Sequence, residues 1–227
     1  MRILCFIPAR AGSKSIKNKN LIKINSKPLI YYTIKFAKKI KNSFIFVSTD
    51  SRKILKYTNK LNLNNNYIRP KKLSGDSSPV IDALIDSLNW LKTNGKNFDV
   101  VILLQPTNPV RNIFEINKAI NLFRKKNLDS LVSVTRMREH PYECIEIKKD
   151  QSFKFLKTNP NKKSSGRQDY KKNFFFIDGN FYISKVSFLL KYNKFIDSNA
   201  TKFFIQKSIW PIDIDYLEDI KVAKNFL

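Results

Sequence analysis

Residues 3–20 read ILCFIPARAGSKSIKNKN, a short apolar run that leads directly into a polar segment. Its first five residues, Ile3 to Ile7, are all apolar, which is typical of a strand buried on both faces of a parallel sheet. A loop of small and basic residues follows at once. In an open α/β sheet, ligands bind beyond the carboxyl ends of the strands. The opening of the chain therefore predicts a buried strand followed by a ligand-binding loop.

The rest of the chain alternates strand and helix patterns. Short apolar runs predict buried strands at residues 44–47, 100–104 and 131–134, and a shorter strand at 67–69. Apolar residues at helical spacing predict helices that begin at Pro28, Ser51 and Pro79, one over 113–123 and a last one over 217–227. Alternation with short connections predicts the α/β class with a mostly parallel sheet.

The pattern changes between residues 138 and 172, which are polar and have few periodic apolar positions. Strand-like runs resume at 174–176 and 181–183. With 227 residues, no internal repeat and no linker between equal halves, the chain fits one domain. We expect a single domain over 1–227 that carries an insert at about 140–172.

The charge is extreme: 43 Lys+Arg against 18 Asp+Glu give a net charge of +25. A balance this basic is a first indication of nucleic-acid binding. However, the chain has 34 Lys, 9 Arg, 24 Asn and 27 Ile, a mix that AT-rich codons produce without selection for a partner. The lysines are spread along the chain, and no aromatic-plus-basic RNA-recognition motif occurs. We therefore favour compositional bias and a general attraction to polyphosphates.

The chain shows no sign of a membrane or an export signal. No apolar run approaches 18 residues, and the apolar run at 3–7 is too short for a signal peptide. Cys5 and Cys144 form neither a metal-binding spacing nor a disulfide framework. We expect a cytoplasmic protein. His140 is the single histidine, so no catalytic Ser/His/Asp or Cys/His set can be built, and it is a weak candidate for a general base.

Three constellations can carry chemistry. The loop after the first strand has a turn of small residues, Ala11 to Ser13, whose backbone N–H groups can approach an anion, and Arg10, Lys14 and Lys19 can neutralise a triphosphate. It matches neither the Walker A loop nor GxGxxG. The alternative interpretation is a solvated basic loop.

The second constellation is LLQPTNPVR at residues 103–111, which also leaves the carboxyl end of a predicted strand. Its two prolines stiffen a wall that can present Gln105 in a fixed position. The alternative is a simple turn before the helix at 113–123. That alternative suits Pro109 and Arg111 better than it suits Gln105.

The third constellation is Asp213-Ile214-Asp215. Residues i and i+2 of an extended segment point to the same side, and two carboxylates placed so can bind Mg²⁺ together with substrate phosphates. The alternative is N-capping of the last helix, which explains one Asp but not both.

Taken in this order, the three constellations resemble the acylneuraminate cytidylyltransferases, also called CMP-sialic acid synthetases. The family's opening pattern, approximately IPARxGSKxIxxKN, is matched by residues 7–20. Its LLQPTSPLR pattern is matched by 103–111, with Asn108 for Ser and Val110 for Leu, and its DIDxxxDL pattern by 213–220. The resemblance spans nearly the whole chain.

The resemblance implies a three-layer nucleotide-diphospho-sugar transferase (Rossmann-like) fold with a small dimerisation insert. It implies that CTP activates N-acetylneuraminate or a related nine-carbon acidic sugar (a nonulosonate), with Mg²⁺ or Mn²⁺, to give the CMP-sugar and pyrophosphate. A homodimer is implied as well, because in such enzymes the insert crosses to the partner subunit. The family's sugar side often has Asn-Gly-Ala where this chain has residues 178–180, so legionaminate and pseudaminate stay open as substrates. A non-catalytic polyphosphate- or RNA-binding module is the alternative from another class.

The resemblance also implies a role for each motif residue. Arg10, Lys19 and Asp215 would be the catalytic residues, and Asp213 and Asp215 would hold the metal. The sugar would meet Gln105, Arg167 and Tyr182. The residues expected to bind CTP are Arg10, Ser13, Lys14, Lys19, Asn20, Arg69 and Ser78.

Overall fold

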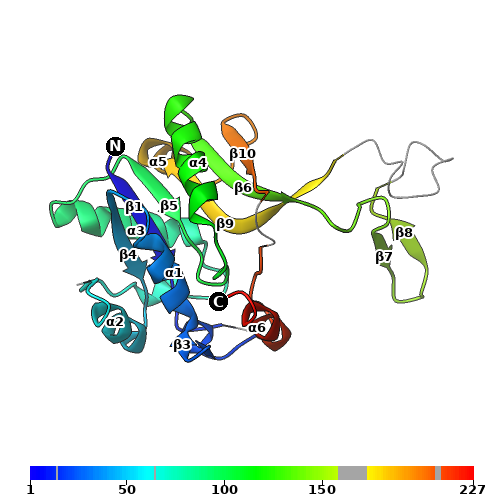
Figure 1. The fold of residues 1–227 in the computed structure, drawn as a ribbon, viewed down its shortest axis with the longest axis horizontal. Helices are drawn as coiled ribbons and strands as arrows, with labels where there is room; N and C mark the ends of the chain where they lie inside the picture. The colour runs from blue at the N-terminus through cyan, green and yellow to red at the C-terminus, as the bar shows by residue number, and fades with distance from the viewer. Residues whose placement is uncertain (14, 64, 158–172, 208–210) are drawn as a thin grey trace.

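The protein, seen here as a computed structural model, is described for residues 1–13, 15–63, 65–157, 173–207 and 211–227. A six-stranded sheet forms its centre, in the order β10-β6-β9-β5-β1-β4 (Figure 1). β1 pairs in parallel with β4 and β5, β10 pairs in parallel with β6, and β9 runs antiparallel to both of its neighbours. The strands of this sheet are β1 (Ile3–Pro8), β4 (Ser43–Ser48), β5 (Val100–Leu103), β6 (Ser130–Arg136), β9 (Phe175–Lys185) and β10 (Thr201–Ile205).

Helices cover both faces of the sheet, so the body has three layers. Alternate side chains of β1 divide the core: Ile3, Cys5 and Ile7 pack in one apolar cluster with α1, α2 and α4, while Leu4 and Phe6 pack in another with α3 and α5. The helices are α1 (Leu29–Ala37), α2 (Arg52–Asn59), α3 (Val80–Thr93), α4 (Ile113–Lys125), α5 (Val186–Tyr192) and α6 (Leu217–Ala223). None of the described helices is both long and apolar enough to cross a membrane.

A third apolar cluster joins the two ends of the chain near the carboxyl edge of the sheet. Ile16, Ile24 and Leu29 pack there against Ile214 and Ile220. The N-terminal side of this cluster includes the 3-10 helix η1 (Lys19–Leu21) and the small ladder of β2 (Lys23–Ile24) and β3 (Lys27–Pro28). This packing holds the segment before α6 against the loop that follows β1.

Several sequence predictions are corrected by the structure. Residues 67–69 form no strand. The Arg69 N–H donates to the carbonyl of Thr49, just beyond β4, so Arg69 lies at the carboxyl edge of the sheet. The 3-10 helix η2 (Lys71–Leu73) follows. The runs predicted at 174–176 and 181–183 belong to one strand, β9, which is irregular where its pairing with β6 shifts between Val132 and Val134. The sequence patterns predicted neither α5 nor β10.

The insert leaves the body as an arm that ends in a two-stranded hairpin, β7 (Ile145–Ile147) and β8 (Phe153–Phe155) (Figure 1). Ile145 lies opposite Phe155, and Ile147 lies opposite Phe153. Cross-strand partners share one face of a hairpin, so this face is apolar, and the four side chains are 47% to 61% exposed. The Glu146–Lys154 ion pair occupies the other face. Residues 158–172 of the insert lie outside the described chain.

Candidate active site

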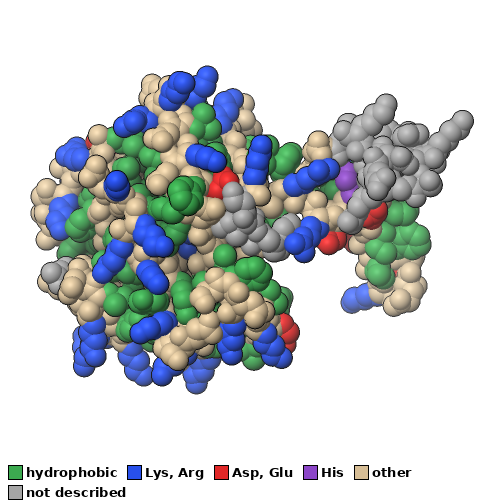
Figure 2. All heavy atoms as spheres, viewed as in Figure 1, with side chains coloured by type: hydrophobic (Ala, Val, Ile, Leu, Met, Phe, Trp, Pro, Cys, Tyr) green, Lys and Arg blue, Asp and Glu red, His purple; other side chains and the backbone are tan. Residues whose placement is uncertain are grey.

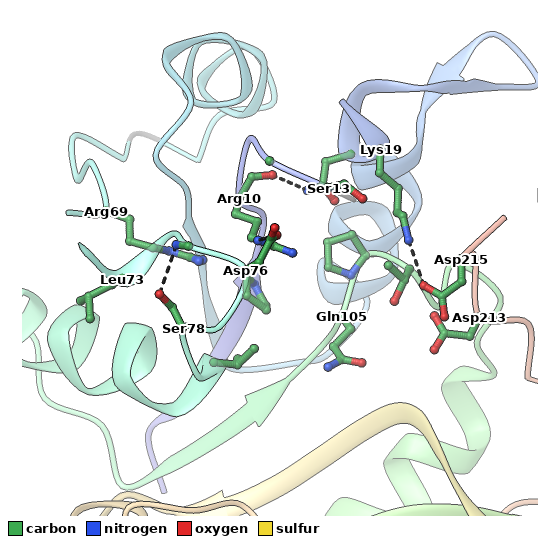
Figure 3. A pocket seen from close by; sticks show the side chains of 17 residues that line it. Arg10, Ser13, Lys19, Arg69, Leu73, Asp76, Ser78, Gln105, Asp213 and Asp215 are labelled. Carbon is green, nitrogen blue, oxygen red and sulfur yellow. Dashed lines mark hydrogen bonds and ion pairs between the residues drawn. The ribbon is translucent and has the colours of Figure 1, made fainter. Parts of the chain in front are cut away.

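The three predicted constellations meet at the carboxyl edge of the sheet and line one cavity of about 380 Å³ (Figure 3). The strand order reverses at β1, since the chain leaves β1 for β4 on one side and returns to β5 on the other. A crevice at such a reversal is where open α/β sheets bind ligands. The predicted site residues that line this cavity are Arg10, Ser13, Lys19, Asn20, Arg69, Ser78, Gln105, Asp213 and Asp215.

The loop after β1 is fixed by hydrogen bonds to its neighbours. The backbone N–H of Ala9 donates to the carbonyl of Ser48 at 2.8 Å, and that of Ala11 donates to Oδ1 of Asp50 at 2.7 Å. Asn20 donates from Nδ2 to the carbonyl of Arg10 at 3.0 Å. These bonds hold Arg10 and the small-residue turn at the cavity, as an anion-binding loop requires.

Lys19 connects this loop to the other end of the chain. Its ammonium donates to the carbonyl of Ile214 at 2.7 Å and to Oδ1 of Asp215 at 2.9 Å (Figure 3). The residue is only 7% exposed, so its charge is largely shielded from solvent. Lys19 is therefore placed beside the carboxylate pair, where it can neutralise one of the two acids.

Asp213 and Asp215 both face the cavity, while Ile212 and Ile214 between and before them are buried. This alternation agrees with the extended geometry predicted for the segment. Neither Asp caps α6, whose N-cap position is Tyr216. Instead, Asp219 accepts the backbone N–H of Asp215 at 2.8 Å, and that of Tyr216 at 2.7 Å. The helix start thus holds the pair in place and leaves both carboxylates for a ligand.

The two carboxylates are close enough to influence each other. Loss of hydration raises the pKa of Asp213, the Thr107 hydroxyl lowers it, and the charge of Asp215 raises it further. Like charges held side by side favour a cation between them. The described part of the chain has no metal site built from three or more His, Cys, Asp or Glu residues, so any metal here would have only these two carboxylates as protein ligands. A donor set of two carboxylates fits Mg²⁺, which takes its remaining ligands from water and substrate phosphates.

Arg69 and Ser78 lie at the opposite end of the cavity from the carboxylate pair (Figure 3). Arg69 is 4% exposed and donates from Nε to Oγ of Ser48 at 3.0 Å and from Nη2 to the Ser48 carbonyl at 2.6 Å. Burial lowers the pKa of Arg69. The Ser78 hydroxyl closes a turn: it accepts the Gly75 N–H and donates to the Lys72 carbonyl, both at 3.1 Å.

Gln105 follows β5, and its loop is clamped from behind by Arg111. The Arg111 guanidinium donates to the carbonyls of Gln105 (2.6 Å) and Asn180 (2.8 Å) and to the Thr33 hydroxyl (3.0 Å). Burial lowers the pKa of Arg111 to about 9, and nearby carboxylates oppose that shift. The sequence left two interpretations of this segment, a ligand-binding wall and a simple turn. Gln105 fits the first because it faces the cavity, and Arg111 fits the second because its role is structural.

Gly179 lies directly against this loop. Its φ is +69°, and a Cβ placed on it would come within 3.0 Å of Nδ2 of Asn108 and 3.1 Å of Oε1 of Gln105. Asn108 is fully buried, and neither polar atom of its side chain has a hydrogen-bond partner. The backbone of β9 therefore forms a close-fitting floor under Gln105.

Two other candidate residues, Tyr182 and His140, do not line the cavity. Tyr182 packs on the ring of Phe195 with centroids 5.7 Å apart, and burial followed by the charges of Asp178 and Asp213 raises its pKa. His140 lies on the arm, where its ring is tilted against that of Tyr142 and meets that of Phe174 edge to face. Lys14 and Arg167 lie outside the described residues, so their predicted roles stay predictions.

The cavity also holds residues that sequence reasoning missed. Asp76 pairs with Arg10 across the cavity, and Thr107 lines it beside Asp213. Asp50 and Ser48 stand behind the lining, where they hold the β1 loop and Arg69. Ser48 and Asp50 had a signal in the sequence, since they end a predicted strand at the same edge as the first loop, and Thr107 lies within the LLQPTNPVR segment. Asp76 had none.

A three-layer α/β body with a loop of small and basic residues, buried cations and a carboxylate pair at its strand reversal is typical of nucleotide-binding transferases. The chain belongs to the cytidylyltransferase family, whose profile matches residues 4–226.

Curated relatives match along nearly the whole chain. The protein is 35% identical to CMP-N,N'-diacetyllegionaminic acid synthase of Legionella pneumophila, over 95% of this chain and 91% of that protein. It is 33% identical to post-translational flagellin modification protein B of Campylobacter coli, over 98% and 93%. It is 28% identical to N-acylneuraminate cytidylyltransferase of Streptococcus agalactiae, over 96% of this chain and 52% of that protein.

A solved structure of CMP:2-keto-3-deoxy-manno-octonic acid synthetase complexed with CTP has the same fold. Its TM-score is 0.73 at 15% identity, and the match covers 99% of this chain and 98% of that one. The nucleotidyltransferase fold predicted from the sequence is therefore confirmed.

Proposed function

We propose that this cytidylyltransferase activates N-acetylneuraminate or a related nonulosonate with CTP. In this reaction the anomeric hydroxyl oxygen attacks the α-phosphorus, the bond to the bridging oxygen of the β-phosphate breaks, and pyrophosphate leaves with that electron pair. The proton of the hydroxyl is released to solvent. The observation that carries the proposal is the single cavity in which Arg10, Lys19, Asp213 and Asp215 converge.

The phosphates are assigned to the end of the cavity formed by the β1 loop. In-line displacement at phosphorus asks the protein mainly for positioning and charge neutralisation. Arg10 and Lys19 supply fixed cations, and the turn that contains Ser13 supplies backbone N–H groups. We also assign Lys14 to the triphosphate, as the sequence predicts.

The cytidine is assigned to Arg69 and Ser78 at the other end of the cavity, together with Asn20 of the β1 loop. Arg69 is held rigidly by Ser48, so its remaining N–H groups present a preorganised donor to a base or ribose oxygen. The turn closed by Ser78 shapes the wall beside it.

The sugar is assigned to Gln105, with Tyr182 and Arg167 in the wider site. N-acetylneuraminate is the first candidate, and pseudaminate stays open. The 35% identity to a CMP-N,N'-diacetyllegionaminic acid synthase favours a legionaminate as the second candidate.

Mg²⁺ or Mn²⁺ is assigned to Asp213 and Asp215. Such an ion neutralises charge on the transferring phosphoryl group. Lys19 would hold Asp215 in position for it through the 2.9 Å ion pair.

The proposed protein is a homodimer of single-domain subunits over residues 1–227, with residues 140–172 as the dimerisation insert. The apolar face of the β7–β8 hairpin supports this, because an exposed apolar face of this kind marks an interaction site. The proposal places the reaction in the cytoplasm, where CTP is available. The proposal includes no membrane and no nucleic acid as a partner. Figure 2 supports the second point, because Lys and Arg are scattered over the visible face rather than gathered in one patch.

The test measures pyrophosphate release from CTP and Mg²⁺ with a panel of nonulosonic acids, including N-acetylneuraminate, a legionaminate and a pseudaminate. We expect release with at least one acid, and none from the Asp215→Ala variant, which should keep its fold because the carboxylate is exposed in the cavity. If no acid gives release while CTP still binds, the chain is a non-catalytic polyphosphate-binding module.

A further inference from the structure

Among the described residues that line the cavity, basic and acidic side chains are equal in number, although the chain as a whole is strongly basic. Three basic residues, Arg10, Lys19 and Arg69, and three acidic residues, Asp76, Asp213 and Asp215, are among the described residues that line it. The whole chain carries +25. A site for a triphosphate is expected to be strongly positive, so the acids here need an explanation.

Two of the three cations are held by acids. Lys19 pairs with Asp215, and Arg10 pairs with Asp76 through Nη1 and Oδ1. The proposed metal site explains Asp215, which Lys19 would hold in position for the cation. Asp76 lies away from that pair, on the turn that joins η2 to α3 (Figure 3).

The turn that carries Asp76 is built to hold its shape. The Gly75 N–H donates to Ser78 Oγ, the Ser78 N–H donates to the Gly75 carbonyl at 3.2 Å, and Ser78 Oγ donates to the Lys72 carbonyl. A carboxylate on such a turn stays near Arg10 when a ligand arrives. A phosphate that approaches Arg10 must therefore displace the Asp76 carboxylate or share the guanidinium with it, and both cost binding free energy.

We propose that Asp76 is an internal counterion that competes with nucleotide phosphates for Arg10 and thereby limits the affinity of the cavity for polyphosphate anions. This inference rests on the proposed function, because it takes Arg10 as a phosphate ligand. Its consequence is that the cavity releases pyrophosphate more readily than an unopposed cluster of cations would, and so does not remain occupied by its own product.

The experiment is a double-mutant cycle read by isothermal titration calorimetry on the full chain. CTP and, separately, inorganic pyrophosphate are titrated into the wild type, Asp76→Asn, Arg10→Ala and the double variant. The Arg10–Asp76 pair is partly exposed, with side chains 31% and 45% accessible, so its interaction is modest. We expect Asp76→Asn to tighten both ligands by roughly two- to fivefold, and to have no effect when Arg10 is already alanine.

Asp82→Asn is the matched control. It removes the same charge from the first turn of α3, close in sequence but outside the cavity lining. A tightening by Asp82→Asn equal to that of Asp76→Asn would reduce the effect to overall charge and overturn the inference. Weaker or unchanged binding in Asp76→Asn, or equal tightening with and without Arg10, would also overturn it. A wild type that binds neither CTP nor pyrophosphate would instead remove the proposed function itself.

Discussion

At the scale of single residues, the ionised carboxylate of Asp213 lies in an unfavourable environment when no cation is beside it. The pKa of Asp213 is raised above 3.8, first by loss of hydration and then, against the Thr107 hydrogen bond, by the charge of Asp215. A carboxyl whose folded pKa lies above its unfolded value binds its proton more tightly in the folded state. Ionised Asp213 therefore disfavours folding of the metal-free protein at neutral pH.

Asp213→Asn is accordingly expected to stabilise the metal-free protein at pH 7. The gain should stay below about 1 kcal/mol, because the side chain is exposed to the cavity. It should shrink as the pH falls through the raised pKa and vanish below the unfolded pKa, where Asp213 is protonated in both states. Urea unfolding over a pH series measures it, with Asp82→Asn as the control for net charge. A gain that does not change with pH would contradict this reasoning.

Arg10 is expected to act mainly on the rate. If its guanidinium neutralises charge that develops on the phosphates, Arg10→Ala removes roughly 2.7–4 kcal/mol of transition-state stabilisation, by analogy with loss of one oxyanion-hole donor. Steady-state kinetics with CTP should show kcat falling by about 10²–10³-fold. Arg2→Ala is the control, because Arg2 pairs with Asp99 away from the cavity. An unchanged kcat would take Arg10 out of the reaction.

At the scale of elements, the irregular part of β9 shapes the floor beneath Gln105. Gly179 has a φ of +69°, and Gly95, far from the site, has a φ of +73°. A Cβ on Gly179 would press on Asn108 and Gln105, whereas a Cβ on Gly95 would have no atom within 4 Å. A comparison of substitutions at the two glycines therefore distinguishes the effect of backbone strain, common to both, from the effect of crowding the site, which only Gly179 has.

Both Gly179→Ala and Gly95→Ala should lose about 1–3 kcal/mol of stability through backbone strain. Only Gly179→Ala should also displace Gln105 and raise the KM for the sugar, with the KM for CTP changed much less. Thermal unfolding and initial rates on both variants measure this. Equal effects of the two substitutions on the sugar KM would show that Gln105 is not held by β9.

The elements also show how far the sequence predicts this protein. Continuous apolar runs predicted β1, β4, β5 and β6, because strands buried on both faces exclude polar residues. The same rule failed for β9, where Asp178 is buried but accepts hydrogen bonds from Ser133, Thr135 and Gln206. Partners from other strands make this acid compatible with a sheet interior, and no local pattern reveals them.

For the site as well, some residues could be predicted from the sequence and others could not. The first two motifs were predictable because each follows a buried strand, and the carboxyl ends of neighbouring strands meet at one edge. Asp213 and Asp215 were predictable from their i, i+2 spacing on an extended segment. The partners were not predictable. Lys19 and Asp215 are 196 positions apart, and Asp76 is 66 positions from Arg10 in a polar turn without a distinctive pattern.

At the scale of the whole molecule, the arm exposes an apolar surface that packs against no part of the described body. Its hairpin separates residue types cleanly: Ile145, Ile147, Phe153 and Phe155 share one face, and the Glu146–Lys154 pair occupies the other. Figure 2 shows this apolar group at the end of the arm, away from the body. Burial of each such Phe contributes about 1.5–3 kcal/mol, so an arm that closes on a second subunit gains several kcal/mol from this face.

The double variant Phe153→Asp/Phe155→Asp should therefore convert the proposed dimer to a monomer at micromolar concentration. Light scattering after size-exclusion chromatography measures the mass. The body should stay folded, because the hairpin strands pair only with each other among the described strands. Phe203→Asp is the matched control: Phe203 is 51% exposed on the edge strand β10, similar to Phe155 at 55% but outside the arm. A double variant that stays dimeric, or a Phe203 variant that dissociates, would move the subunit interface from the arm to another surface.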